Sequence, residues 1–251
     1  MPRRFRPALL AGLAVVAVAV IAVVLWRTVA SSPPPITGTQ LDQPVPDVAL
    51  VNQHGDSVRL SDLRGKVVVI YPFLTACHEL CPMTTGAFIR MSEAVKAAGL
   101  AGRVAFLEVT VDPGRDTPGR LAAYADLVSA DWTMLTGTPD ALDRFWSFFG
   151  VTHERTSIGS PAPTDWYTGT PETYDVSHTP ALIFLDPQGH ERIVLVGTAD
   201  LGGQLQPSLR AMLNDTGLAN LAHPDAPWTV RQALDNVGAL LGRSIPLPAG
   251  S

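Results

Sequence analysis

Basic charge is scarce in this sequence. The net charge is −5, the pI is near 5.6, and the only basic cluster is Arg3, Arg4 and Arg6 at the extreme N-terminus. This distribution argues against nucleic-acid binding. The sequence also has no internal repeat, no phosphate-binding P-loop, no zincin helix and no sustained heptad pattern. These absences argue against a repeat protein, a P-loop nucleotide-binding protein, a zincin metalloprotease and a coiled coil.

Cysteine is also scarce, and the two that are present, Cys77 and Cys81, lie close together. They follow a continuous β-branched run over 66–71, which is typical of a central strand buried on both faces. Apolar residues at helical spacing come next, from Met83 onward. Pro82 suits the first turn of that helix. Both sulfurs are therefore expected at a helix N-terminus, where the dipole and the free N–H groups favour thiolate over thiol.

The spacing of the two cysteines leaves their chemistry open. In a helical turn, residues four positions apart have Cα atoms roughly 6 Å from each other. This separation allows a disulfide between Cys77 and Cys81, and it also allows one metal ion to be shared by the two sulfurs. A purely structural disulfide in an exported domain is the plainest alternative to redox or metal chemistry.

The N-terminal part of the chain is predicted to lie in and beside a membrane. Residues 8–26 carry no charge and are long enough to cross a hydrocarbon core of about 30 Å. Arginines precede this segment and only Arg27 follows it directly, a bias that keeps residues 1–7 in the cytoplasm and the globular part outside. We therefore predict a single-pass anchor in the cell membrane with an extracytoplasmic domain. A cleaved signal peptide is the alternative.

Beyond the anchor, one globular domain is expected. Residues 27–46 contain a run of three prolines and small polar residues, which indicates an extended linker. The domain is predicted over 47–243 and a frayed tail over 244–251. Strands are predicted over 48–51, 57–60, 66–71, 103–111, 132–135, 181–185 and 193–196, and helices beginning near Pro82, Pro118, Pro139, Ser208 and Val230. A long loop is expected over 151–176.

Two histidines lie in or just after that loop. His178 stands at the start of a predicted strand, where a lone histidine is more often a hydrogen-bonded edge residue than a metal ligand. It therefore needs a partner elsewhere in the chain to matter for function. His153 lies inside the long loop and is expected to be solvated.

The order of elements, with cysteines at the first helix of the domain, resembles the thioredoxin-like fold. We therefore expect an α/β three-layer sandwich with a central mixed sheet, preceded by the transmembrane helix. Three motifs narrow this further: Cys77-x-x-x-Cys81-Pro82, the segment DPGRDTP at 112–118, and Val176-Ser177-His178-Thr179. Together they resemble the SCO/SenC family of copper-delivery proteins, from about Val45 to Gly242. Thr179-Pro180 resembles the cis-proline position of thioredoxin-like folds.

The resemblance implies that Cys77, Cys81 and His178 bind one copper ion. Thiolates suit Cu(I), and the imidazole helps the same site accept Cu(II). Such a ligand set also suits zinc. The resemblance further implies delivery to the copper-binding subunit of cytochrome c oxidase, for assembly of its binuclear copper centre. Another copper chaperone or a thioredoxin-like reductant is a further expected partner, and we expect a metallochaperone rather than an enzyme.

The chain departs from the family pattern at two positions beside the site. His78 follows the first cysteine, where the family commonly has proline, and Ser177 precedes the histidine, where the family commonly has aspartate. Groups that contact a metal ligand orient it and tune the metal. The metal affinity and redox behaviour of the family therefore apply to this chain less safely than the identity of the ligands. We expect His78 to face solvent beside the site and Met83 to pack on its helix face, although each also offers an additional ligand atom.

A thiol:disulfide oxidoreductase that keeps the oxidase's copper-ligand cysteines reduced is the main alternative. It also uses Cys77 and Cys81, but it has no need of His178. A peroxidase is a weaker alternative, because the register places His78 where the reactive cysteine of that family belongs.

Overall fold

The computed structural model describes residues 17–18, 20, 33–225 and 227–248. The predicted anchor over 8–26 lies outside the described residues, apart from 17–18 and 20, as does the predicted cytoplasmic segment 1–7. Within the described ranges, no helix combines the length and apolar character needed to span a bilayer.

In the described part of the chain, eight strands form one mixed sheet of order β1-β10-β9-β4-β5-β6-β2-β3. They are β1 (Thr39–Pro44), β2 (Ala49–Asn52), β3 (Ser57–Arg59), β4 (Val67–Phe73), β5 (Val104–Thr110), β6 (Thr133–Thr136), β9 (Ala181–Leu185) and β10 (His190–Val196). The neighbours β4, β5 and β6 run parallel, and the other pairings are antiparallel. Two small sheets pair β7 (His153–Thr156) with β8 (Asp175–His178), and β11 (Ala199–Asp200) with β12 (Trp228–Thr229).

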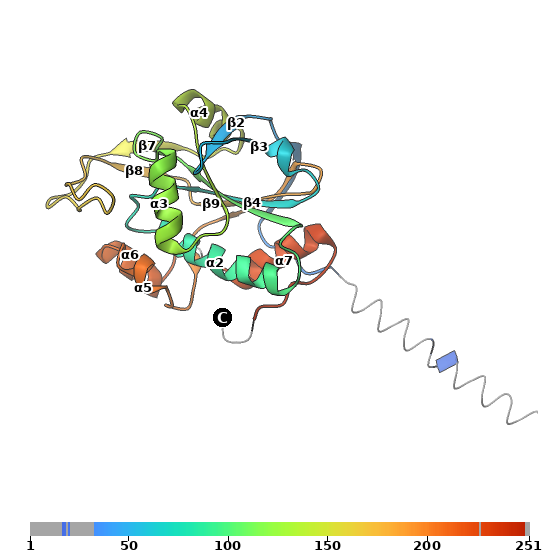
Figure 1. Ribbon diagram of the computed structural model, residues 1–251. Helices are drawn as coiled ribbons and strands as arrows, with labels where there is room; N and C mark the ends of the chain where they lie inside the picture. Colours follow the sequence, from blue (N-terminus) through green and yellow to red (C-terminus); the bar gives the residue numbers. More distant parts are fainter. Residues whose placement is uncertain (1–16, 19, 21–32, 226, 249–251) are drawn as a thin grey trace, which may run out of the picture.

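Helices cover both faces of the sheet. α2 (Cys81–Ala97) and α7 (Val230–Leu241) lie together on one side, and α4 (Pro139–Phe148) lies on the other (Figure 1). The remaining helices are α3 (Pro118–Val128), α5 (Pro207–Arg210), α6 (Asp215–Ala222) and the 3-10 helix η1 (Leu60–Leu63). The predicted α/β sandwich with a central mixed sheet is confirmed.

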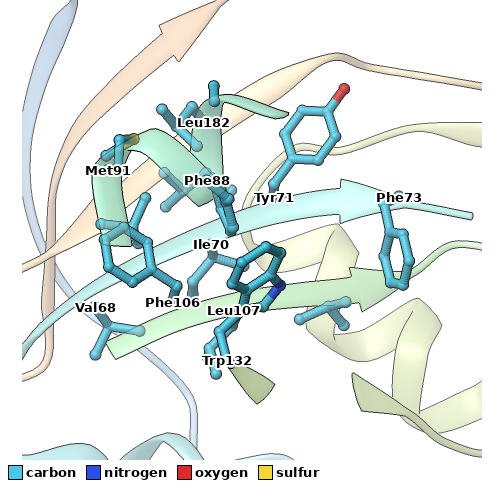
Figure 2. Close-up of a cluster of buried hydrophobic side chains, with 14 of the residues drawn as sticks. Val68, Ile70, Tyr71, Phe73, Phe88, Met91, Phe106, Leu107, Trp132 and Leu182 are labelled. Carbon is cyan, nitrogen blue, oxygen red and sulfur yellow. The ribbon is translucent and has the colours of Figure 1, made fainter. Parts of the chain in front are cut away.

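The apolar core between α2 and the sheet holds α2 in place. Every residue of β4 is buried, as its β-branched run predicts. Phe88 of α2 packs against the rings of Phe106 and Trp132, with centroids 5.4 and 5.8 Å away. Figure 2 shows this cluster, with Met91 from the same helix and Ile70 from β4 beside it. Such ring pairs add to the free energy gained by apolar burial. Packing thus anchors α2, and with it the cysteine at its N-terminus.

The predicted helix starts at Pro118, Pro139 and Val230 are confirmed. In each case the preceding threonine caps the helix, because its side-chain oxygen accepts a backbone N–H in the first turn. The last of these helices ends at Gly242, whose φ of 69° is readily adopted only by glycine.

The predicted linker over 27–46 differs from the structure at its C-terminal end. Thr39–Pro44 is the edge strand β1, which pairs with β10, and Thr37 exchanges backbone hydrogen bonds of 2.8 and 2.9 Å with the Asn236 side chain. An edge strand pairs on one side only and tolerates polar side chains, so the local sequence gives little sign of it.

Two further expectations are wrong, and one helix was missed. The stretch 151–176 is not one long loop, because β7 pairs with β8 across it. The short helix α6 was not expected at all, since its eight residues include glycine and asparagine and follow no extended apolar period. The peptide bond before Pro180 is not cis; among the described residues the cis bond precedes Pro161.

Candidate metal centre

The two cysteines lie where β4 gives way to α2, as predicted. Cys81 is the first residue of α2 and is fully buried, whereas Cys77 lies in the preceding loop and is half-buried. Both are free thiols. The backbone N–H of Cys81 donates a hydrogen bond to the Cys77 sulfur at 3.4 Å. The first turn of the helix therefore holds the Cys77 sulfur next to the Cys81 backbone.

His178 comes to the same point from β8. Its Nε2 atom lies 3.6 Å from the Cys81 sulfur. Its other ring nitrogen, Nδ1, lies 3.2 Å from the carbonyl oxygen of Thr179, which fixes the proton on Nδ1 and leaves the Nε2 lone pair toward the sulfur. The ring also stands edge-on to Tyr71 of β4, with centroids 6.2 Å apart.

The electrostatics of the three groups differ. A hydrogen bond from the Cys81 thiol is the main cause that lowers the pKa of Cys77 to about 7, and backbone N–H groups of the loop lower it further. Burial raises the pKa of Cys81 well above its usual value. Burial also lowers the pKa of His178, so its imidazole is neutral at pH 7. A neutral imidazole and a thiolate are the forms that bind metal ions.

The distances fit a small metal ion between Cys81 and His178. In a tetrahedral site, a sulfur at about 2.3 Å and a nitrogen at about 2.0 Å from the metal lie about 3.5 Å from each other. The observed separation of 3.6 Å is close to this. Across the described ranges, no three His, Cys, Asp or Glu side chains already surround one point as a metal cluster does. The structure therefore brings Cys81 and His178 together, without such a cluster that includes Cys77.

The loop before Cys77 is held by the buried carboxylate of Asp116, from the 112–118 motif. Asp116 accepts hydrogen bonds from the Thr75 hydroxyl at 2.5 Å, the Thr75 N–H at 3.2 Å and the Thr110 hydroxyl at 2.6 Å. Burial raises its pKa to about 6. The motif thus ties the end of β5 to the cysteine loop, a role that its turn-forming residues alone do not reveal.

Arg120 and Trp166 make a second set of contacts with the same loop. Arg120 donates to the Thr75 hydroxyl at 2.5 Å and to the Asp165 carboxylate at 2.6 Å. The indole of Trp166 donates to the Thr75 carbonyl at 2.8 Å. Sequence reasoning missed Asp165 and Trp166, because they lie in the irregular stretch between β7 and β8 and meet the loop only through the fold.

A family model described as SCO1/SenC matches residues 38–203, which is most of the described domain and includes all three candidate ligands. The chain belongs to the SCO1/SenC family. The match starts one residue before β1 and ends between β11 and α5. The segment that carries α5, α6 and α7 therefore lies beyond it.

Curated relatives of this SCO1/SenC protein include a protein from Stutzerimonas stutzeri named "Putative copper-binding protein", 28% identical over 151 residues, with 60% of this chain and 68% of the relative covered. The mitochondrial SCO1 homologue of Mus musculus is 29% identical over 141 residues, with 56% and 46% covered. The chain thus spans about half the length of the mitochondrial relative.

Solved structures share the fold of this SCO1/SenC protein. The solution structure of apo Sco1 from Thermus thermophilus is 27% identical, with a TM-score of 0.50, and covers 75% of this chain and 96% of its own. The copper-bound structure of ScoI from Bradyrhizobium japonicum has a TM-score of 0.52 at 20% identity and covers 71% and 97%. The thioredoxin-like fold expected from the sequence is confirmed.

His78 does not face solvent in this SCO1/SenC protein, contrary to expectation. Its Nε2 lies 2.8 Å from the buried Glu172 carboxylate and its Nδ1 lies 2.8 Å from the Met212 carbonyl oxygen. Both ring nitrogens are therefore engaged away from the sulfurs. The hydrogen bond to Glu172 is the main cause that raises the pKa of His78 to about 9. The Glu172 carboxylate also accepts a hydrogen bond from the Arg115 guanidinium at 3.3 Å, so it is shared between two cations.

Met83 behaves as expected. Met83 is fully buried in the core beneath α2, which agrees with packing. Ser177 is exposed on β8, and the Nδ1 proton of His178 is held by a backbone carbonyl in place of a neighbouring carboxylate.

Proposed function

We propose that this protein is a membrane-anchored, extracytoplasmic copper metallochaperone that binds one copper ion through Cys77, Cys81 and His178. The observation that carries the proposal is the 3.6 Å approach of Cys81 Sγ and His178 Nε2 from distant parts of the chain. Membership of the SCO1/SenC family and the copper-binding relative support it. The apolar run over 8–26, with arginines ahead of it, supports the anchor and the outer location.

Each ligand has a distinct part in this proposal. Cys77, whose pKa is about 7, supplies a thiolate at neutral pH, and it is the more exposed of the two cysteine residues. Cys81 and His178 form the buried side of the site. Two thiolates suit Cu(I), and the imidazole extends the site to Cu(II). A three-ligand site leaves a position where a ligand of the recipient protein attaches before copper leaves.

The recipient that we propose is the copper-binding subunit of cytochrome c oxidase, for assembly of its binuclear copper centre. Mitochondrial SCO1 homologues among the relatives support this assignment, as does the outer location proposed for the domain. Another copper chaperone or a thioredoxin-like reductant is the proposed source of copper or electrons.

Copper titration of the full chain in detergent tests the proposal. After anaerobic reduction, the protein is titrated with Cu(I) against a chromophoric chelator, and separately with Cu(II) while thiolate-to-copper charge transfer is recorded. We expect one copper per chain. His178→Ala should weaken binding by at least about tenfold, whereas His54→Ala, an exposed turn residue, should not. Equal affinities for both variants would remove His178 from the site.

A thiol:disulfide oxidoreductase is the second candidate, favoured by the asymmetry of the two cysteines. Cys77 combines a lowered pKa with partial exposure, and Cys81 is buried behind it with a raised pKa. A dithiol reductant uses such a pair, with the exposed thiolate as the attacking group. This function predicts rapid disulfide exchange that is unaffected by His178→Ala, together with no stable copper complex.

A further inference from the structure

The two-stranded sheet of β7 and β8 brings a second histidine beside His178. His153 is the residue directly opposite His178 in the antiparallel register. Directly opposed residues of an antiparallel pair project to the same face, with Cβ atoms roughly 5 Å apart. The two imidazoles are therefore cross-strand neighbours, although the sequence separates them by a long irregular stretch.

His153 lies on the solvent side of this pair. Its side chain is 25% exposed. Both histidines line one cavity of about 440 Å³, together with Pro180 and residues beside them on the two strands. The cavity gives a small ion access to the histidine pair.

A carboxylate stands behind His153. Nε2 of His153 lies 3.4 Å from the Asp143 carboxylate of α4, which leaves Nδ1 for another partner. A carboxylate beside one ring nitrogen of a histidine commonly accompanies metal binding through the other nitrogen. Here the carboxylate is at ion-pair distance and its side chain is 63% exposed. His78 is different in this respect, since both of its nitrogens are already engaged.

We propose that His153 is a second copper-binding side chain, which holds incoming copper together with His178 before the ion moves onto the sulfurs of Cys77 and Cys81. This inference rests on the proposed copper function. Two imidazole nitrogens form a donor set that favours Cu(II), whereas two thiolates favour Cu(I). The histidine pair therefore gives the protein a capture position for the oxidised ion at the edge of the site.

The transfer is a ligand exchange. The bond from copper to His153 breaks as a bond to a cysteine sulfur forms, and His178 stays bound throughout. A sulfur that enters as a thiol releases its proton to solvent. No electron moves in this step, so the oxidation state of the copper is unchanged.

Electron paramagnetic resonance of Cu(II) tests the capture position directly. In the full chain with Cys77→Ser and Cys81→Ser, only the imidazoles remain, and we expect one bound Cu(II) with hyperfine coupling to two nitrogens. Adding His153→Ala should reduce this to one nitrogen and weaken binding by roughly tenfold. Coupling that is unchanged by His153→Ala would overturn the proposal. Circular dichroism on each variant establishes that it is folded.

Stopped-flow uptake by the reduced chain with both cysteines intact provides a second measurement. His153→Ala should slow the appearance of thiolate-to-copper charge transfer by roughly tenfold while the final Cu(I) affinity stays the same. His54→Ala is the matched control. If the unsubstituted chain takes up no copper, the proposed function fails. If it takes up copper normally and His153→Ala behaves like His54→Ala, only the role of His153 fails.

Discussion

Glu172 accepts a hydrogen bond from His78 at 2.8 Å, although 94 positions separate the two residues. The pair lies directly beside Cys77, and the other nitrogen of His78 reaches the carbonyl oxygen of Met212. A third contact, from the Asn214 N–H to the His78 carbonyl oxygen at 2.9 Å, adds the N-cap of α6. The cysteine loop is thus fastened to two segments that are distant in sequence.

Glu172→Gln should lower the pKa of His78 from about 9 toward the ordinary 6.5, because the charged acceptor is lost. The folded pKa exceeds the unfolded value, so the pair stabilises the protein fully below about pH 6.5, and that stabilisation is lost as pH rises through about 9. We expect the variant to lose about 1 to 3 kcal/mol of unfolding free energy at pH 6. Imidazole NMR titration and urea unfolding at pH 6 and 10 measure both effects. An unchanged His78 titration contradicts the pairing.

Cys77 should react with iodoacetamide faster than Cys81, with a rate that rises through a midpoint near pH 7. The Cys81 thiol is the main group that lowers this pKa, so Cys81→Ala should move the midpoint upward, toward 9. Mass spectrometry of the alkylated sites over pH 5 to 10 gives the profile. A midpoint that does not move in Cys81→Ala contradicts the hydrogen bond between the two sulfurs.

Glu108 should make the protein less stable as pH rises. Burial is the main cause that raises its pKa from 4.5 to about 7, despite hydrogen bonds from Thr85 and Trp132. The folded pKa lies above the unfolded one, so its contribution is fully present below about pH 4.5 and is lost as pH rises through about 7. Glu108→Gln should remove this pH dependence of the unfolding free energy, which is worth about 3 kcal/mol. Urea unfolding of both proteins from pH 4.5 to 8 measures this pH dependence. If the unfolding free energies of the two proteins change with pH in parallel, the assignment to Glu108 is contradicted.

Gly217→Ala should separate α6 from the cysteine loop. A methyl group at this position meets the His78 carbonyl oxygen at 2.4 Å and the Leu213 side chain at 2.8 Å. We expect a loss of about 1 to 3 kcal/mol of unfolding free energy and faster alkylation of Cys77. Gly119→Ala, in the first turn of α3, is the control, because its nearest atom is 3.9 Å away. Similar behaviour of the two variants contradicts close packing of α6 on the loop.

Local patterns in the sequence were sufficient for the central elements. The β-branched run of β4, the proline at the start of α2 and the threonine caps of α3, α4 and α7 each act through neighbouring residues, so their positions were predicted closely. The family motifs also named the candidate ligands, of which the structure brings Cys81 and His178 into contact.

Long-range contacts account for what the sequence left hidden. β1 is polar and is held by pairing with β10, and β7 and β8 find each other across an irregular stretch. His78 looked solvated because its partners, Glu172 and Met212, are distant in sequence. The position of His153 opposite His178 depends on the same strand pairing. No local spacing carries information of this kind.

X-ray absorption at the copper edge tests the central claim most directly. The reduced full chain, loaded with one equivalent of Cu(I), should show two sulfur neighbours and one nitrogen neighbour, and His178→Ala should lose the nitrogen while the sulfurs remain. His54→Ala should match the unsubstituted protein. A copper bound by sulfur alone, with the same spectrum in His178→Ala, would contradict the Cys77, Cys81 and His178 site.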